Sequence, residues 1–285
     1  MEVSAAKNGP VADLLLELRG PDTGDSPTPL GEFARRLLRR VSEEWLQEED
    51  RAQVAAAVRA LFELVEETPE GDVAVRVLPA DEAEHRTYLL TVMPDSAFIV
   101  ETLREGMHGR SLAIESLLHP VLVLERGADG RITEVRDRTT EGHRTSAVLL
   151  VLEGSMSDEY AEELRKETAD NLRLLQTATS DFRSMVDQVE AIVADLEEAK
   201  REMSWRAGEI QEVQELLGWL ADGNFVFLGF RRYVLNAGED GTSVIVDPGS
   251  GLGILRDEDR SAFAEPVPID DLAPGLRARL VGGPL

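Results

Sequence analysis

Few side chains in this sequence of 285 residues are suited to metal or nucleophilic chemistry. The four histidines are His85, His108, His119 and His143. They lie far apart, with no His-x-x-x-His motif and no carboxylate at ligand spacing. Lys7 lies near the N-terminus, and Lys166 and Lys200 lie in a highly charged stretch, away from any glycine-rich context that could activate an amine. We therefore predict that this chain contains no catalytic residue and no metal site.

Two further motifs have competing interpretations. His119 is flanked by apolar residues and precedes Pro120, which favours a half-buried structural imidazole over a ligand-sensing one. Gly249-Ser-Gly-Leu-Gly253 follows a predicted strand, as a phosphate-binding loop would, but the third glycine of a G-x-G-x-x-G motif would fall at Ile254. We therefore predict a loop that needs positive φ angles, and no cofactor bound to this chain.

The turn at Pro94-Asp95-Ser96 is the best candidate for a ligand site. A strand-to-helix turn presents free backbone N–H groups, which can bind a carboxylate or another anion. The Asp95 carboxylate could bind an ammonium group, so that the turn would hold a zwitterion such as an amino acid. We predict Asp95, Ser96 and the backbone around Gly109 as effector-binding residues. The competing interpretation is that Asp95 or Ser96 simply caps the helix.

These residues lie in a stretch, residues 87–152, whose pattern predicts a small α+β domain. Residues 87–92 are β-formers, and the apolar residues from Phe98 to Met107 recur at helical spacing, with Gly106 and Gly109 expected to end the helix. A long apolar run, a turn and further strands follow, at residues 112–124, 127–130, 132–135 and 146–152, and a helix opens at Ser157. Strand, helix, strand, strand, helix is typical of a ferredoxin-like fold.

The flanking regions are predicted to be mostly helical. Residues 1–32 combine a short apolar patch with a Pro- and Gly-rich segment, which predicts a flexible tail. Residues 33–66 have a helical pattern, and residues 72–79 alternate as an edge strand would. The patch could also be a docking segment or a frayed terminal helix.

From residue 154 to residue 208 the chain is rich in helix-forming residues, which predicts one long helix or two stacked helices. Its apolar seam fits packing within the chain or a dimer zipper; it comprises Phe182, Met185, Val189, Ile192 and Leu196. A helix at residues 209–220, a strand at 225–235, a turn at 238–241 and a strand at 243–246 are predicted next.

The composition excludes several classes of partner. A formal net charge of −25 repels nucleic acids and anionic membrane surfaces. The absence of cysteine excludes disulfides and thiolate ligands, and fits a reducing cytosol. The N-terminal residues do not resemble a signal peptide, and apolar runs such as residues 147–152 are too short to span a bilayer. We expect a cytoplasmic protein with neither nucleic acid nor a membrane as partner.

Several blocks of the sequence resemble the N-terminal region of the very large NAD-dependent glutamate dehydrogenases of bacteria. Their order and spacing agree with that family from Phe33 to Asp257, and the His-Pro-Val and Phe-Leu-Gly blocks together are more specific than either alone. The blocks are Phe98-Ile-Val-Glu-Thr-Leu103 after Asp95, Leu118-His-Pro-Val-Leu122, Ala128-Asp-Gly130, Asn224-Phe-Val-Phe-Leu-Gly-Phe-Arg-Arg-Tyr233 and Gly249-Ser-Gly-Leu-Gly-Ile-Leu255. The sequence differs from the family at the candidate ligand turn, where Pro94 replaces an aspartate and Ser96-Ala97 replaces Met-Pro.

The resemblance implies a ferredoxin-like βαββαβ domain of the ACT type, a module that binds amino acids and regulates metabolic enzymes. NAD would be used by a catalytic core that lies much further along the chain in that family. The implied organisation is a tail at 1–32, helices at 33–69, a first ACT-like domain at 70–155, a helical connector at 156–222 and the start of a second, incomplete ACT-like module at 223–285.

We therefore expect a non-catalytic region that regulates a homo-oligomeric NAD-dependent glutamate dehydrogenase, which converts glutamate to 2-oxoglutarate, by sensing a small effector such as an amino acid. Two alternatives remain open. One is a stand-alone ACT-type amino-acid sensor or adaptor, and the other is a structural module that dimerises through the seam at residues 182–196. Direct catalysis by this chain would predict NADH formation from glutamate, and we expect none.

Overall fold

A computed structural model describes residues 9–19, 28–80, 86–238 and 241–281 of the chain. These residues form two compact units, Met1–Leu175 and Gln176–Leu285, which are described separately. The division falls inside the segment predicted as a helical connector, residues 156–222.

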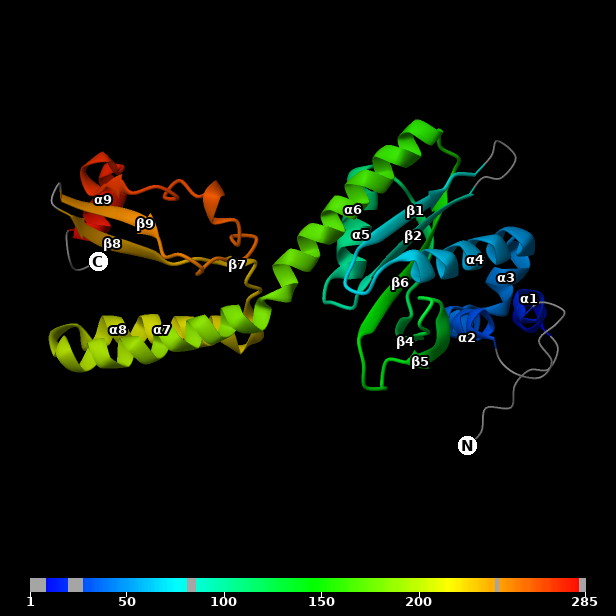
Figure 1. Cartoon of the computed structure of the whole chain (residues 1–285), viewed down its shortest axis with the longest axis horizontal. Helices are drawn as coiled ribbons and strands as arrows, with labels where there is room; N and C mark the ends of the chain where they lie inside the picture. Colours follow the sequence, from blue (N-terminus) through cyan, green and yellow to red (C-terminus); the bar gives the residue numbers. More distant parts are fainter. Residues whose placement is uncertain (1–8, 20–27, 81–85, 239–240, 282–285) are drawn as a thin grey trace. The chain divides into compact units, whose positions relative to one another are not determined.

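The first unit is built on a six-stranded antiparallel sheet (Figure 1). Two long central strands, β2 and β6, pair along nine residues of each, from Arg86 opposite Glu153 to Pro94 opposite Thr145. The prediction that residues 87–92 and 146–152 share one sheet is therefore confirmed, as is the edge strand predicted at 72–79. The strands are β1 (Ala74–Leu78), β2 (Arg86–Pro94), β3 (Ile114–Leu118), β4 (Val121–Arg126), β5 (Ile132–Asp137) and β6 (Arg144–Glu153).

Both faces of this sheet are covered, because β2 and β6 each contain seven consecutive buried residues. Successive side chains point to opposite faces. Leu90 and Leu149 pack with the N-terminal helices on one face, and Leu89 and Leu150 pack with α5 (Ile99–Gly109) and α6 (Asp158–Ser180) on the other. Figure 1 shows these helices on the two sides of the sheet. The first unit therefore has three layers, with the sheet between the N-terminal helices and the layer of α5 and α6.

The strand order is β1–β2–β6–β4–β5, and β3 also pairs with β6. The edge position beside β2 is occupied by β1, which precedes β2 in the sequence. The order of elements along the chain therefore differs from βαββαβ. The fold is α+β as predicted, and its sheet is antiparallel.

The region predicted to be helical at residues 33–66 consists of several helices. Ser42 Oγ accepts a hydrogen bond from the Trp45 N–H at 3.1 Å, and the Asp50 carboxylate accepts one from the Ala52 N–H at 2.8 Å. Each cap starts a new helix, because it satisfies backbone donors that lack an intrahelical partner. The segments are α2 (Pro29–Leu37), a 3₁₀ turn η1 (Leu38–Arg40), α3 (Glu43–Glu48) and α4 (Arg51–Glu67).

The predicted flexible tail at residues 1–32 also contains an ordered helix, α1 (Pro10–Arg19). Leu14 and Leu18 are fully buried in the same core as the sheet. The apolar patch therefore docks within the chain, because it can bury enough surface to be ordered. Residues 1–8 and 20–27 of the predicted tail lie outside the described residues.

The second unit contains two packed helices and two small sheets. The predicted helical stretch continues from α6 into α7 (Phe182–Glu202), and α7 packs against α8 (Ala207–Trp219). Met185 and Val189 of the predicted seam are buried, whereas Phe182 is partly exposed. In the described chain the seam therefore packs within the unit. This unit also contains four short helical turns, which are η2 (Ser204–Arg206), η3 (Leu220–Asn224), η4 (Glu258–Arg260) and η5 (Ile269–Asp271).

The single strand predicted at residues 225–235 is wrong in extent. Residues 225–228 are irregular, and the strand is divided at Arg231, whose guanidinium donates to the carbonyl oxygens of Leu255 and Asp257. The short pieces are β7 (Gly229–Phe230) with β10 (Leu252–Gly253), and β8 (Tyr233–Gly238) with β9 (Gly241–Val246) and β11 (Val267–Pro268), followed by α9 (Pro274–Val281). Residues 239 and 240 of the predicted turn lie outside the described residues. Within the described part of the chain, no helix combines the length and apolarity needed to cross a lipid bilayer.

Candidate functional site

The predicted ligand turn lies between β2 and α5 in the first unit. The Asp95 N–H donates to the Arg144 carbonyl oxygen at 2.8 Å, and the Ser96 hydroxyl donates weakly to the Ala97 carbonyl oxygen at 3.3 Å. The residue that precedes α5 is Phe98, in a left-handed conformation with φ of 69°, and it makes no side-chain capping bond. The interpretation that Asp95 or Ser96 caps α5 is therefore wrong, and the Asp95 side chain is exposed to solvent.

Gly109 lies at the opposite end of the same helix. Because α5 has eleven residues, its two ends are about 15 Å apart, so one amino acid cannot contact all three predicted residues. Neither Gly106 nor Gly109 supplies the left-handed residue that ends the helix. Ser111 does, with φ of 56°, and its N–H donates to the His108 carbonyl oxygen at 2.9 Å. Gly109 is therefore separated from the turn at Asp95 and Ser96.

His119 lies in the tight connection between β3 and β4. Its Nε2 and the Ser146 Oγ share a hydrogen bond of 2.7 Å, and the ring is half-buried. Burial lowers the pKa of His119 from its usual value of 6.5, against the opposing effect of the Asp95 and Glu101 carboxylates. The prediction of a half-buried structural histidine is confirmed. These contacts place the imidazole on the α5 side of the sheet.

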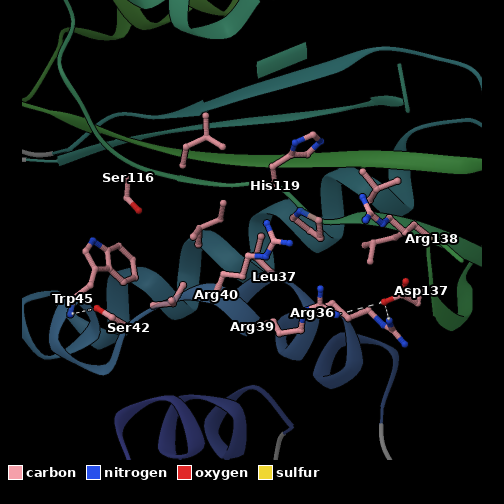
Figure 2. A pocket seen from close by; sticks show the side chains of 16 residues that line it. Arg36, Leu37, Arg39, Arg40, Ser42, Trp45, Ser116, His119, Asp137 and Arg138 are labelled. Carbon is pink, nitrogen blue, oxygen red and sulfur yellow. Dashed lines mark hydrogen bonds and ion pairs between the residues drawn. The ribbon is translucent and has the colours of Figure 1, made fainter. Parts of the chain in front are cut away.

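A cavity of about 550 Å³ lies on the opposite face, between the N-terminal helices and the connection from β3 to β4 (Figure 2). The main chain on both sides of His119 forms one wall, and its imidazole points away from the arginine side chains. Leu37, Leu118 and Leu122 contribute buried apolar surface. The other lining residues are Arg36, Arg39, Arg40, Val41, Ser42, Trp45, Ser116, Leu117, Pro120, Val121, Asp137 and Arg138.

Arginine side chains dominate the charge of this cavity. Arg36 Nη1 donates to Asp137 Oδ2 at 3.1 Å, and Arg39 Nη1 lies 3.6 Å from the same oxygen. Arg36 also pairs with Glu32 at 2.7 Å. These pairs link α2 and η1 to the end of β5, over a sequence separation of 101 residues. The cavity is thus a basic region on a strongly acidic chain.

This arginine cluster was not among the predicted site residues. The signal in the sequence is the concentration of basic residues in Arg35-Arg36-Leu-Leu-Arg39-Arg40, within a chain of net charge −25. Charge clustering could have identified that segment. The contribution of Arg138, from the end of β5, depends on the tertiary fold.

The glycine loop at residues 249–253 belongs to the second unit. Its Gly249 and Gly253 have positive φ angles of 77° and 58°, which confirms that prediction. The Glu258 carboxylate accepts hydrogen bonds from the Gly249 and Gly251 N–H groups at 3.1 and 2.9 Å. The Gly253 N–H donates to Asp181 at 2.8 Å. Carboxylates of the chain itself thus occupy the donors that a phosphate would need. Among the described residues there is also no group of three or more side chains placed to hold a metal ion.

Comparison with known proteins finds a family model that matches most of the first unit. The family "Glutamate dehydrogenase, ACT1 domain" matches residues 33–168, which include the whole sheet. The predicted resemblance to the N-terminal ACT-like region of the large NAD-dependent glutamate dehydrogenases is therefore confirmed. The turn at Asp95, His119 and the arginine cavity all lie inside the ACT1 domain.

Relatives named NAD-specific glutamate dehydrogenase extend the similarity beyond the ACT1 domain. The protein of Pseudomonas aeruginosa is 26% identical over 232 residues, covering 79% of this chain and 14% of the relative. Those of Halomonas elongata and Mycobacterium tuberculosis are each 27% identical, over 190 and 210 residues, covering 64% and 70% of this chain. This chain spans only 12–14% of the length of these relatives.

Proposed function

We propose that this chain is a non-catalytic regulatory region of a large NAD-dependent glutamate dehydrogenase that oxidises glutamate to 2-oxoglutarate in the cytoplasm. The observation that carries the proposal is the ACT1 match over residues 33–168, on a continuous sheet from β2 to β6. NAD would bind elsewhere in such an enzyme, because the glycine loop of this chain is occupied by its own carboxylates. The proposal predicts that the purified chain forms no NADH from glutamate.

The proposed effector is an amino acid, bound at the start of α5. Because Phe98 makes no side-chain cap, backbone N–H groups of the first turn are available to the effector's carboxylate. The exposed Asp95 carboxylate would bind its ammonium group, with Ser96 beside it. Gly109, at the far end of α5, would contribute only through a second effector or a neighbouring subunit.

Regulation by such an effector requires two states that bind it with different affinities. We propose a homo-oligomer in which ACT-like domains pair between subunits. We also propose that the sheet of the first unit is ferredoxin-like, with β1 as its fourth strand. Residues 223–285 are proposed to be part of a second ACT-like module. The alternative of dimerisation through the α7 seam is disfavoured, because Met185 and Val189 are already buried within the described chain.

Calorimetric titration of the purified chain with amino acids tests the effector proposal. We expect saturable heat with at least one of glutamate, aspartate and leucine, and its loss in Asp95→Ala. Asp158→Ala is the matched control, because it removes an acidic residue at the start of α6 in the same unit. Absence of heat with every amino acid would overturn effector binding, and equal loss in both variants would overturn the assigned site.

A further inference from the structure

We propose that the arginine-lined cavity between η1 and the end of β5 binds a small dianion, a metabolite that carries a phosphate or two carboxylates. This site is separate from the proposed amino-acid site at the start of α5, and it lies on the other face of the sheet. Its basic groups come from α2, η1 and the residue after β5 (Figure 2).

The net charge of the side chains around the cavity indicates how many negative charges a ligand should carry. Four arginines line the cavity, namely Arg36, Arg39, Arg40 and Arg138. Two carboxylates face them, because Asp137 pairs with Arg36 and Arg39, and Glu32 pairs with Arg36. Subtracting two carboxylates from four guanidinium groups leaves two positive charges. A dianion would neutralise this excess.

The guanidinium groups that carry the excess are accessible. Arg40 and Arg138 are exposed, and within the described residues neither makes an ion pair or a side-chain hydrogen bond. Arg39 is also 65% exposed, so that N–H groups not directed at Asp137 face solvent. Arginine is suited to phosphate and carboxylate oxygens, because its planar fork can donate two parallel hydrogen bonds.

Asp137 shows that arginines from separate elements can converge on one anionic oxygen. Its Oδ2 atom is 3.1 Å from Arg36 Nη1 and 3.6 Å from Arg39 Nη1. An incoming ligand would extend this arrangement toward Arg40 and Arg138. The carboxylate of Asp137 holds the Arg36 and Arg39 side chains in place, so fewer rotamers of these two need to be ordered when the ligand binds.

The shape of the cavity favours a small organic anion over a simple halide. Its volume of about 550 Å³ is within the range of metabolite sites. Buried leucine side chains and the half-buried Trp45 supply apolar surface for a carbon skeleton. Nucleic acid is a poor alternative, because the rest of the chain carries a large negative charge.

The test is calorimetric titration of the purified chain with glycerol 3-phosphate, succinate and acetate at low ionic strength. We expect saturable binding of at least one dianion, with the dissociation constant for acetate about tenfold larger or more, because one of two charge-assisted contacts is missing. Tighter binding of glycerol 3-phosphate would indicate a phosphate ligand, and tighter binding of succinate would indicate a dicarboxylate ligand. Affinity should fall as salt is added, because exposed charges are screened.

The decisive variant is Arg40→Ala with Arg138→Ala, which should weaken dianion binding about tenfold or more. These side chains have no described partner, so the fold should be retained. Arg131→Ala is the control, because Arg131 is 80% exposed in the same unit but outside the cavity. Loss of binding in the control as well would mean a general charge effect and would overturn the site.

Trp45 fluorescence provides a second measurement. A dianion should change the emission of the chain, and Trp45→Phe should abolish that change while Trp205 and Trp219 remain. Absence of saturable binding for both dianions would overturn the proposal, as would unchanged affinity in the double arginine variant. Asp95→Ala should leave dianion binding intact, so failure of the amino-acid proposal can be told apart from failure of this one.

Discussion

The two units of this chain contain antiparallel sheets that are covered to very different degrees. In the first unit, β2 and β6 each have seven consecutive buried residues. In the second unit, every residue of β8 is exposed, including Tyr233, Val234 and Leu235. The first sheet is covered by helices on both faces, whereas the hydrophobic cluster around β9 has three buried members among the described residues, Val244, Ile269 and Leu272.

The comparison indicates that the units are stabilised by different interactions. Burial of apolar side chains dominates the first unit, since it scales with the area removed from water. The second unit relies more on polar contacts, such as those of Asp181 with the Gly253 N–H and Arg256. Single-residue variants in each unit can test this difference.

Leu149→Ala should destabilise the first unit by about 2–5 kcal/mol, because it leaves a cavity in a core where the side chain is 1% exposed. The matched change Leu235→Ala, at a side chain 51% exposed on β8, should cost less than about 0.5 kcal/mol. Hydrogen exchange of each unit during denaturant titration reads the two effects separately. If the two changes lowered the free energy of unfolding by similar amounts, the two units would not differ in how much they depend on apolar burial.

Arg86→Met tests whether a buried charge also contributes to the first unit. Arg86 Nη1 lies 2.6 Å from a carboxylate oxygen of Glu49, whose side chain is only 2% exposed, and Arg86 Nε lies 2.6 Å from Glu115. Removing the guanidinium should cost about 2 kcal/mol, below the cost for a fully buried pair because Arg86 is 30% exposed.

The double variant Arg86→Met with Glu49→Gln provides the control for this prediction. It should recover part of the loss, because it removes the uncompensated carboxylate. Denaturation monitored at β2 measures both variants, and equal stability of the single and double variants would count against a charge effect.

Asp181→Asn should destabilise the second unit by about 1 kcal/mol. The Gly253 N–H, followed by Arg256, lowers the pKa of Asp181 despite partial burial. Because the folded pKa is depressed, this contribution is present above the usual value of 3.8 and is lost as the pH falls through the folded value. Asp187→Asn on α7 is the control, since its side chain is 60% exposed. If Asp181→Asn frees the loop at residues 249–253 from α7, limited proteolysis should cut this loop faster than in the unchanged chain.

The smallest expected effect is a pH dependence due to His119 in the first unit. Burial lowers the pKa of His119, so the unfolded chain binds more protons than the folded chain as the pH falls through 6.5. Stability at this site is therefore lost on acidification as the pH falls through 6.5 toward the lower pKa of the folded state. His119→Asn should reduce that loss relative to the unchanged chain. An identical pH profile in thermal unfolding would contradict the assignment.

Much of the first unit could be predicted from local pattern. The apolar runs at 87–92 and 146–152 indicated strands buried in one sheet, and the glycine-free stretch after residue 154 indicated helices. Both follow from periodicity, which a sequence displays directly. The helices predicted at residues 33–69 were not assigned boundaries, because the caps at Ser42 and Asp50 interrupt a pattern that is otherwise helical throughout.

The candidate sites depended more on tertiary structure. The sequence alone suggested Asp95, Ser96 and Gly109 as one site. The structure shows that the length of α5 separates Gly109 from Asp95 and Ser96. The acidic charge, the sheet-forming and helix-forming segments and the family resemblance follow from residue types and their spacing, so they can be recognised without a structure. Which arginine side chains lie close together depends on the folded chain. Arg36 reaches Asp137 across 101 residues, and no local periodicity specifies a contact between side chains so distant in the chain.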